Sequence, residues 1–173
     1  MNVPAADHRI EPLQPSHDRG AFHCGVPALD SYLKNQASQD ARRKVAAPFV
    51  MLDRSDVIVG YYTLSAHAVS LRELPDSIAR RLPRYPLLPA TLLGRLAVST
   101  QHRGRNLGRL LLMDALHRSW KNTGEMASIG VVVDAYDESA KAFCLHHEFL
   151  PLLDHPERLS LAMATIEKAF TMR

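Results

Sequence analysis

Residues 90–120 read ATLLGRLAV, STQHRGRN and LGRLLLMDALHRSW, and this stretch decides the fold. Residues 90–98 are rich in leucine and predict a central strand. Residues 107–120 repeat apolar side chains at helical spacing and predict a helix. The turn between them, 99–108, is polar and contains two glycines. A buried strand that passes through a short turn into a helix is typical of α/β proteins.

The elements on either side complete this pattern. We expect a short strand at 9–13, a helix at 27–45, strands at 48–52 and 57–65 around a turn at 53–56, and then a proline-rich segment at 75–89 with a short helix at 76–81. After the central unit follow a strand at 129–134, a helix at 139–147 and a strand at 158–163. The helix at 27–45 is predicted because an apolar residue recurs at every fourth position: Leu29, Leu33, Ala37, Ala41 and Val45.

This order predicts an α/β fold with a mixed, twisted sheet of about six to seven strands flanked by helices. Its first half should be largely antiparallel, and 90–98 should pair in parallel with 129–134. The length of 173 residues suits a single domain over 1–173, with 1–8 as a loose tail.

Composition argues against a membrane-spanning, secreted or disulfide-rich protein. The chain is 46% hydrophobic, and it contains no apolar run long enough to cross a bilayer and no apolar signal-peptide core. Its two cysteines, Cys24 and Cys144, are far apart, so we expect no disulfide framework and no metal site, and a cytoplasmic protein without a membrane partner. A net charge of +3 comes with clusters of basic residues that would attract a polyanion.

The turn at 99–108 has the features of a phosphate cradle. The first N–H groups of a helix have no partner within the helix and, with the helix dipole behind them, bind phosphate oxygens. Gly104 and Gly108 would allow positive φ, and Arg103, Arg105 and Arg109 add positive charge. We therefore expect a cofactor that carries a diphosphate. No G-K-[ST] follows, which disfavours a nucleotide-hydrolysing loop.

Residues 93–98 (LGRLAV) followed by 103–108 (RGRNLG) resemble the acetyl-CoA motif of the GNAT acetyltransferases, [QR]-x-x-G-x-[GA]. Asn106 stands where the motif has its middle glycine, and asparagine is a non-glycine residue that tolerates left-handed backbone. The resemblance implies a GNAT fold with acetyl-CoA as cofactor. It also implies a set of cofactor-binding residues: Leu96, Ala97, Val98, Arg103, Gly104, Arg105, Asn106, Leu107, Gly108, Arg109 and Phe143.

Further segments resemble the toxin branch of that family, the TacT/AtaT-like acetyltransferases. They are FHCG at 22–25, LDSYL at 29–33, VGYYTLS at 59–65, LPRYP at 82–86 and VDA at 133–135, with RL at 158–159 and MATI at 163–166. The resemblance implies acetylation of the α-amino group of aminoacyl-tRNA, inhibition of translation, and neutralisation by a ribbon-helix-helix antitoxin. It also implies a homodimer.

Basic and aromatic residues outside the turn are candidates for contact with tRNA phosphates: Arg42, Arg43, Lys44, Arg84, Tyr85 and Arg95. Each has an ordinary alternative. Arg42, Arg43 and Lys44 would also favour the dipole at a helix C-terminus, Arg95 could form a structural ion pair, and Tyr85 could simply pack.

Cys144 departs from the family's catalytic residues, whereas Val98 corresponds to one of them. AKAFC at 140–144 resembles the family's A-x-x-F-Y segment, so Cys144 stands at the position of the tyrosine that acts on the leaving thiolate. A thiol is a weaker hydrogen-bond donor than a phenol, so the enzyme could be slow. The family's oxyanion contact corresponds to the backbone N–H of Val98. Glu148 replaces a common glycine and should be tolerated if it is exposed.

Two alternatives remain at this point. One is a GNAT enzyme that acetylates a protein or small-molecule amine. The other is a catalytically weakened GNAT that binds its ligands with little turnover, because of Cys144 and Asn106. A plain nucleic-acid-binding protein is disfavoured, since the sequence has no helix-turn-helix and no aromatic RNA platform.

Overall fold

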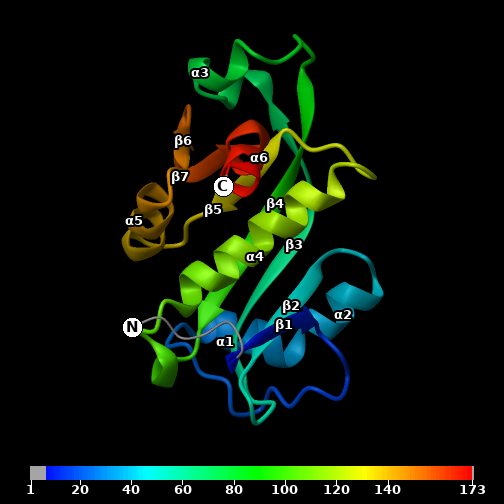
Figure 1. The fold of residues 1–173 in the computed structure, drawn as a ribbon, viewed down its shortest axis with the longest axis vertical. Helices are drawn as coiled ribbons and strands as arrows, with labels where there is room; N and C mark the ends of the chain where they lie inside the picture. Colours follow the sequence, from blue (N-terminus) through cyan, green and yellow to red (C-terminus); the bar gives the residue numbers. More distant parts are fainter. Residues whose placement is uncertain (1–6, 173) are drawn as a thin grey trace. The chain divides into compact units, whose positions relative to one another are not determined.

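The computed structural model describes residues 7–172, and most of the loose tail expected at 1–8 lies outside this range (Figure 1). Seven strands form one sheet in the order β1-β2-β3-β4-β5-β7-β6. The strands β1 (Arg9–Pro12), β2 (Ala47–Leu52) and β3 (Ile58–Ser70) pair antiparallel, and β4 (Leu87–Val98) pairs parallel with β5 (Gly130–Asp134). The expected mixed sheet and its parallel pair are confirmed.

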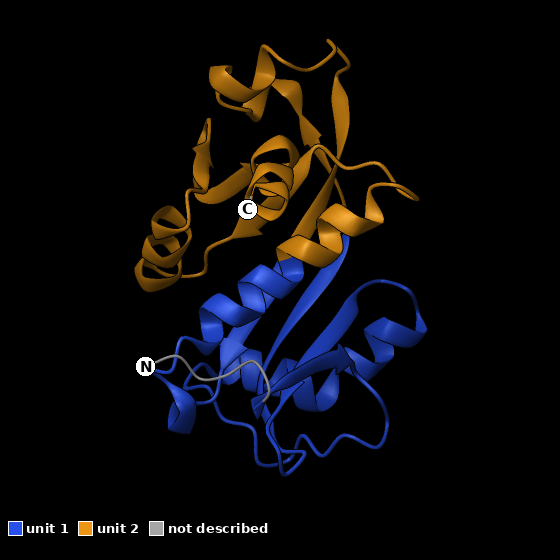
Figure 2. Ribbon diagram, viewed as in Figure 1, with its two compact units in different colours: residues 1–65, 94–115 blue, residues 66–93, 116–173 orange. Residues whose placement is uncertain are grey.

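The chain divides into two compact units (Figure 2). Unit 1 comprises residues 1–65 and 94–115, and unit 2 comprises residues 66–93 and 116–173. Three elements contribute to both units: β3, β4 and α4 (Leu107–Asn122). The expectation of a single domain therefore stays a prediction.

Unit 1 has a core of aromatic and aliphatic side chains under α1 (Pro27–Asn35) and α2 (Ala37–Arg42). Tyr61 lies in this core, stacks on Tyr32 with ring centroids 6.3 Å apart, and donates its hydroxyl to the carbonyl of Leu29 at 2.7 Å. The expected turn at 53–56 is present. The Asp53 side chain accepts hydrogen bonds there from the amides of Ser55 and Val57.

The prediction of one helix at 27–45 is wrong in one respect. The chain forms two helices, which are separated at Gln36, where φ is −121°. The second helix ends early because Lys44 turns left-handed, with φ of 61°. The Val45 amide then bonds to the carbonyl of Asp40, and the Lys44 amide bonds to that of Ala41. This is a Schellman ending, and it leaves Val45 60% exposed instead of in the apolar stripe.

Unit 2 contains the other half of the sheet. There β7 (His155–Ala162) pairs antiparallel with both β5 and β6 (Leu150–Leu152). Gly130 permits a close approach of strands, because a Cβ at that position would lie 2.5 Å from the carbonyl oxygen of Leu161. Two short helices match the expected ones, α3 (Asp76–Ala79) and α5 (Glu138–His146).

Three elements of unit 2 had no counterpart in the sequence prediction: the 3₁₀ helix η2 (Leu71–Glu73), β6 and α6 (Met163–Thr171). The strand expected at 158–163 ends one residue earlier, because Met163 begins α6. Ala162 stands at the N-cap of this helix and offers no side-chain cap, so the usual sequence signal for a helix start is missing. In the part of the chain that is described, no helix has the length and apolarity needed to cross a membrane.

Helix α5 also ends in a Schellman motif, and Glu148 occupies its left-handed position with φ of 71°. The Phe149 amide bonds to the Cys144 carbonyl and the Glu148 amide to that of Leu145, both at 3.1 Å. Glu148 is exposed, as the sequence analysis required. A side chain with a Cβ is strained in this conformation, which explains why glycine is common at the position in the family.

Replacing Glu148 with glycine should stabilise the protein by about 0.5–1 kcal/mol, because the relief of left-handed strain exceeds the added entropy of the unfolded chain. Chemical denaturation should show this gain. The matched control is Glu148→Ala, which removes the carboxylate but keeps a Cβ and should give no gain. Equal stabilisation by both variants would mean that charge, and not backbone strain, is what the glycine relieves.

Candidate functional site

The turn between β4 and α4 contains two residues with left-handed backbone. A short 3₁₀ helix, Thr100–His102, follows the strand, Gly104 has φ of 79° and Asn106 has φ of 59°. Helix α4 begins at Leu107, whose side chain is fully buried and anchors the turn. The exposed backbone from Gly104 to Asn106 therefore leads directly into a helix N-terminus. This combination forms a concave, anion-binding backbone.

The structure confirms the left-handed conformation expected at Asn106 and corrects the expectation for Gly108. Gly108 is the second residue of α4, so it adopts helical backbone and not positive φ. The positive φ values fall on Gly104 and Asn106 because the chain must turn before the helix starts. A Cβ at Gly104 would meet nothing within 4 Å, so this face of the turn is open.

Arg103 ties the turn to the segment that precedes α1. Its guanidinium donates a hydrogen bond to the carbonyl of Cys24. Gly25 has φ of 88°, and a Cβ there would lie 3.2 Å from Nη2 of Arg103, so the arginine packs closely on this segment. The same segment is held by Asp30, which accepts a hydrogen bond from the Cys24 amide at 2.8 Å. Arg103, Arg105 and Arg109 are all exposed, and this hydrogen bond makes Arg103 a fixed part of the turn.

The end of β4 directs two backbone amides away from β3. The Ser99 amide bonds to the Val59 carbonyl on β3 at 2.9 Å. Because backbone groups alternate along a strand, the amides of Leu96 and Val98 point to the opposite edge. The ladder with β5 covers Thr91–Leu93, so both residues lie beyond it. Buried Ala97, between them, directs its backbone toward β3.

Arg95 is packed on an aromatic ring in unit 1. Its Cζ atom lies 3.5 Å from the centroid of Tyr32, which is a cation–π geometry. The Tyr32 hydroxyl donates to Asp40 at 2.8 Å, and burial, with this hydrogen bond second, raises the pKa of Tyr32 to about 12. Hydrogen bonds from Gln36 and Tyr32 lower the pKa of Asp40. The phenol therefore remains a donor at neutral pH and holds α2 to this cluster.

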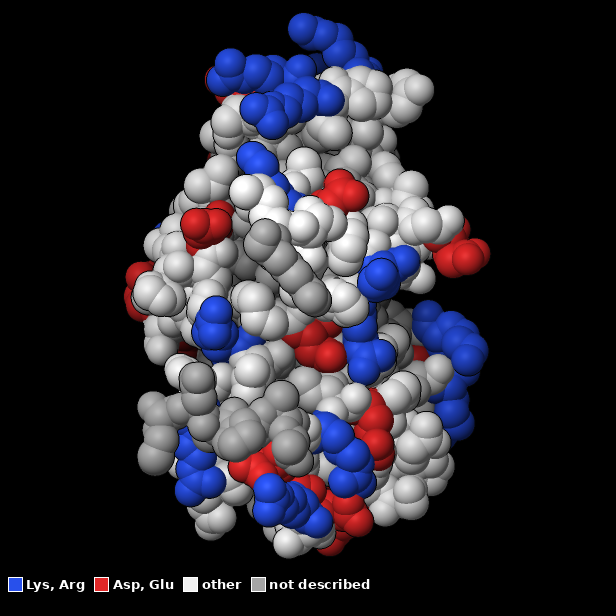
Figure 3. Space-filling model, viewed as in Figure 1, with Lys and Arg blue, Asp and Glu red and all other residues white. Residues whose placement is uncertain are grey.

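The remaining candidates for tRNA contact fall into two groups. Arg42, Arg43 and Lys44 are exposed at the end of α2 in unit 1. Arg84 and Tyr85 lie in unit 2, between α3 and β4, and Tyr85 is 63% exposed. Basic side chains gather over the part of unit 2 around α3 in Figure 3. The exposure of Tyr85 excludes packing in a core as its role.

Cys144 and Phe143 lie on α5 in unit 2. Cys144 is buried, with 4% of its surface exposed, and burial raises the pKa of its thiol to about 11. At neutral pH the group is a protonated thiol, which can donate a proton but is a poor nucleophile. Phe143 packs edge-on against His147, with ring centroids 4.7 Å apart.

A pocket near the turn was not predicted from the sequence. A pocket beside Gly104 and Arg105 is completed by residues from the β2–β3 turn and the segment before β1: Asp7, His8, Asp53, Arg54 and Ser55. The Nδ1 atom of His102 is buried without a hydrogen-bond partner in the described range, and burial lowers the pKa of this histidine. No sequence pattern connects these distant segments. Among residues 7–172, no cluster of three or more His, Cys, Asp or Glu side chains forms a metal site.

Comparisons with known proteins identify the family. The chain is 31% identical over 177 residues to the probable toxin TacT of Sinorhizobium fredii, with 95% of this chain and 96% of that protein covered. It is also 31% identical over 151 residues to a tRNA-acetylating toxin of Mycobacterium tuberculosis, with 87% and 89% covered. No protein-family model matches the chain. The chain belongs to the TacT/AtaT-like toxins of the GNAT acetyltransferases.

Solved structures of this toxin family share the fold. A tyrosine-to-phenylalanine variant of KacT superposes with a TM-score of 0.89 at 28% identity, covering 95% of this chain and 99% of KacT. AtaT complexed with acetyl-methionyl-tRNAfMet gives a TM-score of 0.88 at 27% identity, with 95% and 100% covered. The seven-stranded mixed sheet is therefore the GNAT fold.

The hydrogen bond from Arg103 to the Cys24 carbonyl, here called the Arg103 clamp, should support both the stability of the fold and the binding of acetyl-CoA at the turn. We expect Arg103→Ala to lower the free energy of unfolding by about 1 kcal/mol, because a charge-assisted hydrogen bond to a part-buried carbonyl is lost. The KM for acetyl-CoA should rise about tenfold as the turn loosens. Denaturation and steady-state kinetics measure the two effects.

The matched control is Arg105→Ala, which removes an equal charge from the same turn. It should raise the KM for acetyl-CoA but leave stability unchanged. If the two variants unfold at the same denaturant concentration, Arg103 acts through its charge alone and the clamp has no structural role.

Proposed function

We propose that this protein is an acetyl-CoA-dependent N-acetyltransferase toxin that acetylates the α-amino group of aminoacyl-tRNA and thereby inhibits translation. The observation that carries the proposal is the turn before α4, in which Gly104 and Asn106 both have left-handed backbone. The chain that contains this turn is 31% identical to a tRNA-acetylating toxin. The turn supports acetyl-CoA as the cofactor, and the similarity to a tRNA-acetylating toxin supports aminoacyl-tRNA as the acceptor.

The residues of the turn fit the diphosphate of acetyl-CoA. The open face at Gly104 leaves room for phosphate oxygens, and the exposed guanidinium groups of Arg105 and Arg109 neutralise their charge. Helix α4 directs the N–H groups of Leu107 and Gly108, which have no partner within the helix, toward the same turn. We assign Arg103 and Asn106 to shaping this cradle.

The end of β4 fits the extended arm of the cofactor. Acetyl-CoA, when bound, supplies an acetyl group activated as a thioester. We assign the amides of Leu96 and Val98 to this part, because both point away from β3 and can align a chain along the strand. Ala97 directs its own backbone toward β3, and its place between the two sets their spacing. The Val98 amide would stabilise the negative charge that develops on the carbonyl oxygen when the amine attacks. Phe143 would pack against the cofactor, as the family resemblance implies.

The basic groups support a polyanionic acceptor. AtaT has been solved with acetyl-methionyl-tRNAfMet, and tRNA offers a phosphate at every nucleotide. We propose that four exposed basic residues and one exposed tyrosine contact this backbone: Arg42, Arg43, Lys44, Arg84 and Tyr85. For Arg95, stacking on Tyr32 fixes the guanidinium plane, and its free edge would contact a phosphate.

Cys144 takes the place of the family's tyrosine, and several similar structures are tyrosine-to-phenylalanine variants. We assign the thiol the role of proton donor to the leaving sulfur. With a pKa of about 11 it is protonated throughout the neutral range, so its protonation state is suited to donation. The same pKa disfavours an acyl-cysteine intermediate, since little thiolate is present.

Structures of related toxins support a proposal for the regulation and location of the protein. AtaT has been solved with its antitoxin AtaR, and KacT in a KacTA complex with DNA. We propose that a ribbon-helix-helix antitoxin neutralises this toxin, that the toxin is a homodimer, and that it acts in the cytoplasm, where charged tRNA is found.

Transfer of labelled acetyl from acetyl-CoA to a pool of aminoacyl-tRNA tests this function. The wild type should label the pool, and Cys144→Tyr should do so about tenfold faster or more, because a phenol is the better donor and acid assistance is worth about 10²–10⁴-fold. Deacylated tRNA is the control and should take up no label.

The other outcomes separate the alternatives. Label with Cys144→Tyr alone would mean that the natural chain is a weakened toxin that binds without useful turnover. No label with either protein would contradict the tRNA acceptor, and acetyl transfer to a protein or small amine would then be the function to test.

A further inference from the structure

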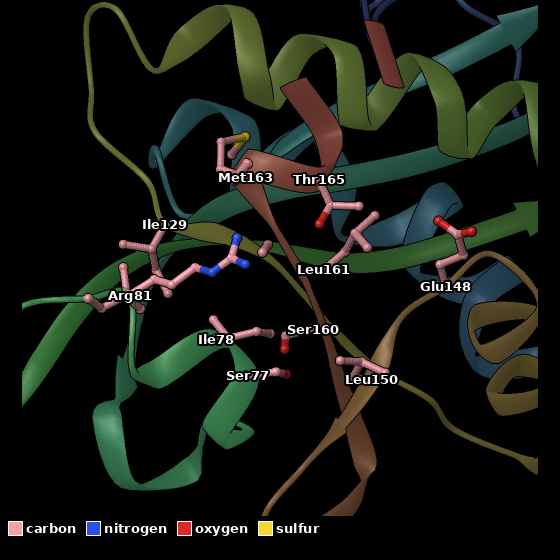
Figure 4. Close-up of a pocket in the computed structure, with 13 residues that line it drawn as sticks. Ser77, Ile78, Arg81, Ile129, Glu148, Leu150, Ser160, Leu161, Met163 and Thr165 are labelled. Carbon is pink, nitrogen blue, oxygen red and sulfur yellow. The ribbon is translucent and has the colours of Figure 1, made fainter. Parts of the chain in front are cut away.

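A pocket in unit 2 contains none of the residues assigned to the cofactor, to acetyl transfer or to tRNA contact. Its walls come from α3 and the residues after it, Ile129 just before β5, the start of β6 with Glu148 before it, the end of β7 and the start of α6 (Figure 4). The thirteen lining residues include neither the turn at 99–108 nor Phe143 and Cys144. The acetyl-transfer chemistry therefore leaves this pocket unexplained.

One wall of the pocket is apolar and continues inward. Ile78, Ile129 and Leu161 line it, and the same three residues line a smaller recess that reaches buried Leu74 and Val132. A surface of this kind gains free energy by covering an apolar chain. The ligand should therefore have an apolar body.

A second wall is the N-terminus of α6, a helix of nine residues. Ala162 at the N-cap has no side-chain acceptor, and the Met163 amide bonds to the Ile129 carbonyl at 2.8 Å. Ala164 and Thr165 line the pocket, and their amides stand in the first turn of the helix, where no carbonyl of the helix is available to them. The first turn of α6 contains no acidic residue to offset the helix dipole. This end of the pocket thus favours a negative charge.

Ser160 supplies an independent sign of a ligand. The residue is only 4% exposed, lines both the pocket and its inner recess, and its Oγ atom has no hydrogen-bond partner within the described residues. Burying a hydroxyl without a partner is unfavourable. A polar atom of a bound molecule would satisfy it.

Arg81 adds a positive charge to the same pocket. In Figure 4 its guanidinium points into the space on the side of Ile129 and Met163, while Glu148 lies on the opposite side. Arginine binds carboxylates through two parallel hydrogen bonds. Arg81 and the N-terminus of α6 therefore give one side of the pocket a positive potential, and Glu148 lies on the other side.

We propose that this pocket binds a small amphipathic carboxylate. The carboxylate is held by Arg81 and the free amides of α6, the apolar chain covers Ile78, Ile129 and Leu161, and Ser160 donates its hydroxyl to the ligand. The site goes beyond acetyl transfer, since none of the residues assigned to that reaction line the pocket.

Isothermal titration of the full-length protein with octanoate tests the proposal, and octan-1-ol serves as the matched ligand without a charge. Octanoate should bind saturably at one site and octan-1-ol at least about tenfold more weakly, since it lacks the charge that Arg81 and α6 recognise. Arg81→Gln should weaken octanoate binding about tenfold or more, and Ser160→Ala about threefold or more.

The control variant is Arg80→Gln, which removes the same charge from the neighbouring residue, whose side chain does not line the pocket. It should change the affinity for octanoate by less than about twofold. Thermal unfolding of each variant verifies that it is folded, and Ser160→Ala gives a second reading if Arg81→Gln is unstable. The proposal is overturned if octanoate does not bind saturably, if octan-1-ol binds equally well, or if Arg80→Gln weakens binding as much as Arg81→Gln.

Discussion

The passage from β4 into α4 depends on left-handed backbone at Gly104 and again at Asn106. These two residues bring the chain round so that buried Leu107 can start the helix while the exposed turn faces solvent. The Arg103 guanidinium then fixes the turn to the Cys24 carbonyl. With this geometry in place, the first amides of α4 become available to an anion, and Leu96 and Val98 extend the same surface along the strand.

The sequence predicted this part well because the signals are local. A leucine-rich strand, a polar turn and an apolar helical repeat occupy adjacent residues, so neither the parallel pair nor the turn required knowledge of distant contacts. The conformation of Asn106 could also be predicted, since asparagine is suited to left-handed backbone. The misassignment of Gly108 shows the limit of composition: glycine permits positive φ but does not require it.

Other features escaped prediction because they depend on contacts between distant residues or on unusual residues at helix ends. Lys44 ends α2 at a position where glycine is the normal signal. Helix α6 begins after Ala162, which is no capping residue. The stacking of Arg95 on Tyr32 joins residues more than sixty positions apart, and the sequence could only leave its role open. The buried environment that raises the pKa of Cys144 is likewise a property of the folded chain.

The most direct test of the central claim is the affinity for acetyl-CoA of two substitutions at Asn106, measured by isothermal titration. Asn106→Gly keeps the left-handed turn accessible and should leave the affinity within about threefold of wild type. Asn106→Val carries a β-branched side chain that strongly disfavours left-handed backbone and should weaken binding about tenfold or more. If Asn106→Val remains folded and binds acetyl-CoA as tightly as wild type, the left-handed turn is not what forms the cofactor site.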